Sequence, residues 1–120
     1  MDINKYIQMA QKDVSYNEAA KAVFLRESKK MLKELADCLG LVKGEYDLRV
    51  NQGGIAVSGE VTLHSDRIYV QVQQGSYMPI LYRSCQYRKD YTGGLNRWLD
   101  WHHLLNWEKF VSSIRNEMRK

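Results

Sequence analysis

Two stretches of the sequence alternate between apolar and polar residues: residues 55–64 read IAVSGEVTLH and residues 68–74 read IYVQVQQ. In an extended chain, side chains point alternately to two faces, and here one face is apolar while the other is polar. We expect the buried face to carry Ile55, Val57, Val61, Leu63, Ile68, Val70 and Val72. We expect the solvent face to carry Ser58, Glu60, Thr62, Tyr69, Gln71 and Gln73. A period of two residues therefore predicts two adjacent β-strands with one buried face.

Further strands are predicted on both sides of this pair. Residues 46–50 (YDLRV) alternate in the same way, and residues 80–87 follow the turn GSYMP, which contains the only proline in the chain. The connection NQGG at 51–54 tolerates positive φ and suits a hairpin. Short connections favour an antiparallel meander of four strands. In the last strand we predict two faces, one with Arg83, Cys85 and Tyr87 and the other with Tyr82, Ser84 and Gln86.

Helices are predicted before and after the strands. Residues 2–11 suit a short helix with Asp2 as its N-cap. The spacing of Ser15 and Glu18 is that of a capping box, and it predicts the start of a long helix that ends at Gly40. The apolar stripe of this helix contains Ala20, Phe24, Met31, Leu32, Leu35 and Leu39. Asn106 is predicted to cap a terminal helix with Trp107, Val111, Ile114 and Met118 on one stripe. Residues 96–105 are expected to form a loop with a helical turn.

These elements predict an α+β fold in which a four-stranded antiparallel meander packs against a long helix and a C-terminal helix. A chain of 120 residues with 44% apolar content is expected to form one domain. It contains no apolar run long enough to cross a bilayer, and its start lacks the pattern of a secretory signal, so we expect a cytoplasmic protein with no membrane partner. In that compartment Cys38 and Cys85 are expected to be separate buried thiols.

Positive charge is concentrated in the last third of the chain. The net charge is +4, and residues 82–120 alone contain eight basic and four acidic side chains. Such an asymmetry is typical of a surface that binds phosphates or an acidic partner, although a solvated basic helix would produce part of it.

The segment at residues 81–98 interleaves cations and aromatic rings around two glycines. Cations that contact phosphates, together with flat rings that stack on unpaired bases, are typical of proteins that bind single strands. The candidate binding residues are Arg83, Tyr87, Arg88, Lys89, Tyr91, Arg97 and Trp98. The structural alternative is that Tyr82 or Tyr87 packs in the sheet, that Trp98 closes the core edge, and that the arginines are solvated or paired with Asp90 and Asp100.

No catalytic triad, metal-ligand spacing or phosphate loop is recognisable, so the sequence predicts a protein that is not an enzyme and has no cofactor or metal. One catalytic alternative is an acid–base set of Glu60, His64 and His102. Glu60 and His64 would lie about 13 Å apart on one strand face, too far for a direct hydrogen bond.

Three segments resemble those of small proteins from bacteriophages, prophages and bacterial genomes: residues 53–64 (GGIAVSGEVTLH), 82–85 (YRSC) and 88–94 (RKDYTGG). The resemblance implies a setting in the cytoplasm of a bacterial host and implies no activity. Phage proteins of this size often bind nucleic acid or block a host enzyme.

Two functions therefore follow as hypotheses. The first is nucleic-acid binding through the basic and aromatic segment. The second is a protein inhibitor or accessory subunit that inserts this segment into an acidic or nucleic-acid-binding groove of an enzyme such as a defence nuclease. Arg, Tyr and Trp are enriched at binding hot spots, so the same residues serve both hypotheses.

Overall fold

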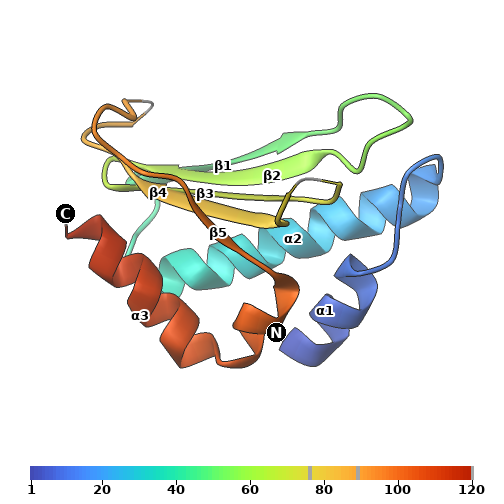
Figure 1. Ribbon diagram of the computed structural model, residues 1–120, viewed down its shortest axis with the longest axis horizontal. Coiled ribbons are helices and arrows are strands. Elements are labelled where there is room, and N and C mark those ends of the chain that lie inside the picture. Colours follow the sequence, from blue (N-terminus) through green and yellow to red (C-terminus); the bar gives the residue numbers. More distant parts are fainter. Residues whose placement is uncertain (76, 89, 120) are drawn as a thin grey trace.

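The computed structural model describes residues 1–75, 77–88 and 90–119, which form three α-helices and one five-stranded antiparallel sheet (Figure 1). The strands are β1 (Tyr46–Asn51), β2 (Glu60–Ser65), β3 (Ile68–Gln73), β4 (Ile80–Ser84) and β5 (Arg97–Leu99), and each pairs with its neighbour in sequence. The predicted α+β meander is confirmed, but it has five strands and not four. With three residues, β5 is too short to show a period, and it is a strand because it pairs with β4.

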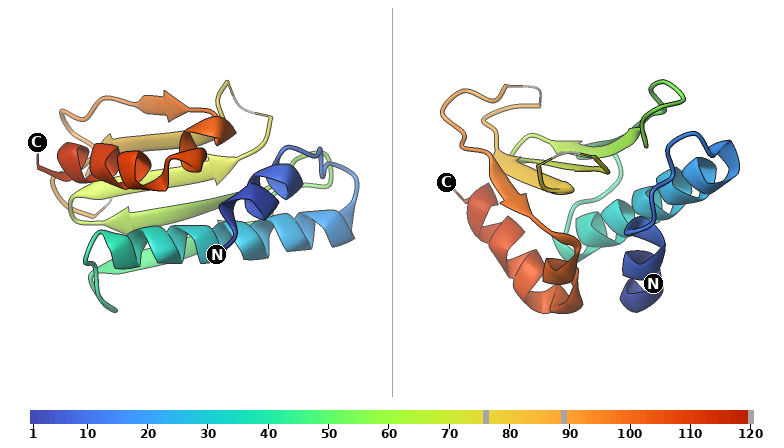
Figure 2. Two further views of the ribbon diagram at one scale, coloured as in Figure 1. Left: turned by 90° about the horizontal axis from the view of Figure 1, so that it is seen from below. Right: turned by 45° about the vertical axis from the view of Figure 1, so that its right-hand side comes forward.

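All the described helices lie on one face of the sheet, and the opposite face is left open (Figure 2). They are α1 (Ile3–Ala10), α2 (Glu18–Cys38) and α3 (Trp107–Met118), preceded by a 3₁₀ helix, η1 (Trp101–Leu105). The long helix α2 packs on β1 and β2, while α3 packs on β3 and β4. We call the uncovered side the open face. Within the described residues no helix is both long and apolar enough to span a bilayer.

The core lies between the sheet and the helices. From the strands it buries Val61, Leu63, Ile68, Val70, Val72, Ile80 and Tyr82. From the helices it buries Phe24, Met31, Leu32, Leu35, Leu104, Phe110 and Ile114. The ring of Trp101 meets those of Tyr6 and Phe24 edge-on, at 5.9 and 6.3 Å between centroids, so η1 joins α1 and α2 in one apolar cluster.

Two of the predicted helix caps are confirmed and one is wrong. The carboxylate of Asp2 accepts a hydrogen bond from the Lys5 amide, and the side chain of Asn106 accepts one from the Lys109 amide. The capping box at Ser15 does not form, because the Ser15 amide donates to Asp13 and the next residue, Tyr16, has a φ of 59°. The helix starts later, where Asn17 accepts from the Ala20 amide at 3.0 Å.

The strand predicted at 55–64 begins only at Glu60, so the expected burial of Ile55 and Val57 is wrong. Their exposed fractions are 60% and 50%, whereas Ser58 is buried. Gly59 breaks the extended chain with a φ of 74°, and a Cβ there would lie 2.7 Å from the Asn51 carbonyl oxygen. Ser58 Oγ accepts from the Gln74 amide at 2.9 Å, which draws this loop onto the end of β3.

Three further expectations are corrected. The strand predicted at 80–87 ends at Ser84, so the alternation does not extend to Tyr87. Within β4, Tyr82 packs in the core and Arg83, the register partner of Tyr69, lies on the open face. Thr62 is buried although it belongs to the polar side of β2, where it stands between its register partners Arg49 and Gln71. Cys38 is exposed in the last turn of α2, whereas Cys85 is buried as expected.

Candidate nucleic-acid interface

The register of the five strands aligns one row of side chains across the whole open face. We call it the central row: it runs Arg49, Thr62, Gln71, Leu81 and Trp98, and each is paired directly with the next. At strand spacings of about 4.8 Å the row spans roughly 19 Å. An exposed guanidinium stands at one end, on β1, and a half-buried indole stands at the other, on β5.

A cluster of three rings lies beside the central row. His64 of β2 and Tyr69 of β3 are register partners with centroids 4.7 Å apart, and the ring of Tyr91 lies 5.3 Å from that of Tyr69. The Tyr91 hydroxyl and His64 Nδ1 are 3.2 Å apart. Burial, with the Glu60 carboxylate as the next cause, raises the pKa of Tyr69 to about 12. The cluster covers His64, which therefore does not show the solvent exposure expected of a polar strand face.

Arg83 anchors the loop that carries Tyr91. Its guanidinium donates to the Tyr91 carbonyl, to the Gly94 carbonyl at 2.9 Å and to Asn96 Oδ1 at 3.0 Å, and it lies 5.1 Å from the centre of the Tyr91 ring. A Cβ on Gly94 would overlap the Ser84 carbonyl oxygen. The donors of Arg83 are thus largely used within the protein, and its main role is to hold Tyr91 over the sheet.

Arg88 also makes contacts within the chain. Its guanidinium lies 3.2 Å from Asp47 Oδ2 and 3.5 Å from Asp66 Oδ1, and it donates to the Gly44 carbonyl at 3.0 Å. The sequence-based alternative paired the arginines with Asp90 and Asp100, but the partners here come from β1 and from the β2–β3 turn. Two carboxylates offset the charge of Arg88.

Arg97 and Trp98 are adjacent in sequence but lie on opposite faces. Arg97 is the register partner of Tyr82 and faces the helices, where its Nε lies 3.6 Å from Glu117 of α3. Trp98 faces the open side, with its ring 6.4 Å from that of Tyr77. Successive side chains of a strand point to opposite faces, so Arg97 and Trp98 cannot share one. The sequence pattern predicts a loop here and no strand.

The seven predicted residues therefore do not form one cluster. Arg83 and Tyr91 are in contact, Trp98 shares their face, and Tyr87 is 68% exposed on the loop. Lys89 lies outside the described residues. Sequence reasoning missed Arg49, which the alternation at 46–50 already placed opposite the apolar side chains Leu48 and Val50.

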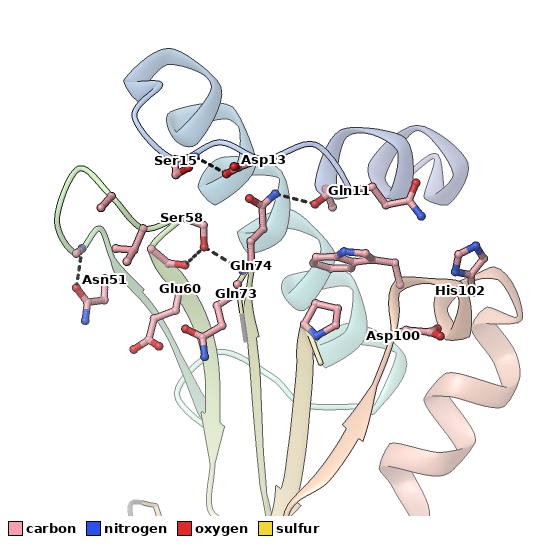
Figure 3. A pocket seen from close by; sticks show the side chains of 18 residues that line it. Gln11, Asp13, Ser15, Asn51, Ser58, Glu60, Gln73, Gln74, Asp100 and His102 are labelled. Atoms are coloured by element: carbon pink, nitrogen blue, oxygen red, sulfur yellow. Dashed lines mark hydrogen bonds between the residues drawn. The ribbon is translucent and has the colours of Figure 1, made fainter. Parts of the chain in front are cut away.

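A cleft of about 1040 Å³ opens at the end of the sheet where β2 begins and β3 ends (Figure 3). Two members of the acid–base alternative, Glu60 and His102, line this end cleft, while His64 lies in the ring cluster and does not line it. Among the described residues, no three His, Cys, Asp or Glu side chains converge closely enough to hold a metal ion.

Comparisons of the chain with protein-family models, with curated proteins and with solved structures found no match.

Proposed function

We propose that this chain is a non-enzymatic protein that binds single-stranded nucleic acid on the open face of its sheet. The observation that carries the proposal is the central row, which places the exposed guanidinium of Arg49 and the indole of Trp98 on one uncovered surface, with the ring of Tyr77 beside Trp98. Bases of a single strand can stack on the rings of Trp98 and Tyr77, and Arg49 supplies a cation for the backbone.

Single strands fit this surface better than duplexes do. Stacking on a side chain requires unpaired bases, which a duplex keeps in its own stack. Readout of the major groove usually requires a protruding helix or β-ribbon, and the described helices lie on the opposite side of the sheet. The net charge of +4 favours a polyanionic ligand in general.

The proposal is tested by fluorescence anisotropy with labelled 12-nucleotide DNA and RNA, single-stranded and duplex, across a salt series. We expect single strands to bind more tightly and affinity to fall as salt rises. Trp98→Ala should weaken binding about 5- to 150-fold, because stacking of one base contributes roughly 1–3 kcal/mol. Trp98→Phe, which keeps a ring, should retain most of the affinity.

The charge contribution has a matched control. Arg49→Ala should weaken binding to all sequences alike and reduce the salt slope by about one unit. Arg26→Ala removes the same charge from the exposed side of α2, away from the open face, and should have little effect. No binding of either single strand at low salt would refute the proposal, as would equal losses for the two arginine variants.

A protein partner is the second candidate, and one observation favours it. The loop after β4 exposes Tyr87 and Leu95, at 68% and 66%, which is typical of a segment that inserts into a partner. A pull-down from nuclease-treated bacterial lysate separates the two hypotheses. A partner retained after nuclease treatment and lost with Tyr87→Ala plus Leu95→Ser would support an inhibitor or accessory subunit.

A further inference from the structure

The end cleft is a cavity with a mixed polar and apolar lining, built from five separate parts of the chain. It lies between the C-terminal end of α1, the segment that follows α1, the β1–β2 loop, the β3–β4 loop and η1 (Figure 3). Its polar lining includes Gln11, Asp13, Ser15, Asn51, Glu60 and Gln73, with Asp100 and His102 on the far side. Trp101 and Pro79 add apolar surface.

Hydrogen bonds hold two walls of this cleft in place. The side chain of Gln74 donates to the Ala10 and Lys12 carbonyls, both at 2.7 Å, and accepts from the Val14 amide at 3.1 Å. The Gln74 amide also donates to Ser58 Oγ at 2.9 Å. The segment after α1 and the β1–β2 loop are thus both hydrogen-bonded to Gln74 at the end of β3, and these bonds fix the two walls of the cavity relative to each other.

The charge of the lining discriminates between ligands. Its ionisable residues are Asp13, Glu60, Asp100 and His102, and no lysine or arginine is among the described residues that line it. Hydrogen bonds from Ser15 lower the pKa of Asp13, which is therefore ionised at neutral pH. A phosphate in this cleft would face like charges without a cation, whereas a hydroxyl group would find acceptors.

The cleft is continuous with the open face. Glu60 Oε2 accepts from Gln71 Nε2 at 2.5 Å, so a wall of the cleft is bonded to the middle of the central row. At the other side, Asp100 follows Trp98 by two residues, and Gly75 and Pro79 of the cleft belong to the loop that carries Tyr77. Glu60, Gln73 and Asp100 of the cleft each lie two residues from a member of the central row, so the cleft lies next to that row at this end of the sheet.

We propose that the end cleft receives the terminal nucleoside of a strand bound on the open face, and that it accepts a terminus that ends in a hydroxyl and rejects one that ends in a phosphate. This inference rests on the proposed function. A nucleoside carries hydroxyl and amine donors that match the carboxylate and amide oxygens of the lining, and its base can contact Trp101. A terminal phosphate adds a charge of up to −2 where Glu60 and Asp100 already stand.

The test uses one internally labelled 12-nucleotide strand in five forms: hydroxyl at both ends, phosphate at the 5′ end, phosphate at the 3′ end, phosphate at both ends, and a covalent circle. We expect a phosphate at one of the two ends to lower affinity about tenfold or more, which corresponds to about 1.4 kcal/mol. The doubly phosphorylated strand and the circle should bind as weakly, and the affected end identifies which terminus enters the cleft.

Variants locate the discrimination. Glu60→Gln and Asp100→Asn should raise affinity for the phosphorylated strand and so reduce the preference, while Glu108→Gln on α3 changes the net charge equally and should not. Equal binding of all five forms by the native chain would overturn this inference and leave the proposed function standing. Absence of binding by every form would overturn both. A preference that survives Glu60→Gln combined with Asp100→Asn would also overturn the assignment to this cleft.

Discussion

Replacing Gln74 by alanine tests how the N-terminal segment is attached to the sheet. The Gln74 side chain forms hydrogen bonds with main-chain groups of Ala10, Lys12 and Val14, which lie 60 to 64 positions earlier in the chain. Alanine removes both donors and the acceptor but leaves the strand backbone unchanged. The N-terminal segment would then depend on the apolar contacts of α1, which buries Tyr6, Ile7 and Ala10.

The magnitude follows from the number and exposure of these bonds. A net hydrogen bond contributes about 0.5–1.5 kcal/mol, and removal leaves its partner to water where the site is accessible. Two of the bonds are partly buried and one is exposed, so water replaces part of what is lost. We expect Gln74→Ala to lower the free energy of unfolding by about 1–2 kcal/mol.

Urea denaturation measures this loss, and amide hydrogen exchange at Val14 shows where it arises. The Val14 amide donates to Gln74 Oε1, so its exchange should accelerate in the variant. Gln73→Ala is the matched control, because it removes the same side chain from the neighbouring residue, which is the last residue of β3. An unfolding free energy within about 0.5 kcal/mol of the native value, with unchanged protection at Val14, would refute the attachment described here.

Replacing Gly94 by alanine should destabilise the protein by about 1–3 kcal/mol in urea denaturation, because a Cβ there would overlap the Ser84 carbonyl and lie 2.9 Å from Arg83 Nη2. Gly54→Ala is the control in the same assay, because Gly54 has open space around it. The raised pKa of Tyr69, about 12 against 10.0 in the unfolded chain, means that the unfolded state releases this proton at lower pH than the folded state does. The free energy of unfolding should hold below pH 10 and decline between pH 10 and 12. Tyr69→Phe should make this decline shallower. If the variant has the same pH profile as the native chain, the burial of the Tyr69 ring is contradicted.

Local patterns in the sequence were sufficient for most of the elements. The alternation at Val61 and Leu63, and again from Ile68 to Val72, reports which side of a strand is buried, and those side chains are in the core. The caps at Asp2 and Asn106 act through bonds to amides three residues away, so they too can be predicted locally. Ile55 and Val57 fit the same alternation but are not in a strand. The positive φ of Gly59 and the hydrogen bond that the Gln74 amide donates to Ser58 make β2 begin only after them.

The candidate site required the tertiary structure. Arg97 and Trp98 lie on opposite faces of β5, which is a strand only because it pairs with β4. Arg83 anchors a loop because the chain brings Gly94 and Asn96 back to accept hydrogen bonds from its guanidinium. The α+β class, the meander and the concentration of basic and aromatic residues follow from local patterns in the chain. Which of these residues share a face, and where the end cleft lies, depends on contacts between residues tens of positions apart, and no local period encodes such contacts.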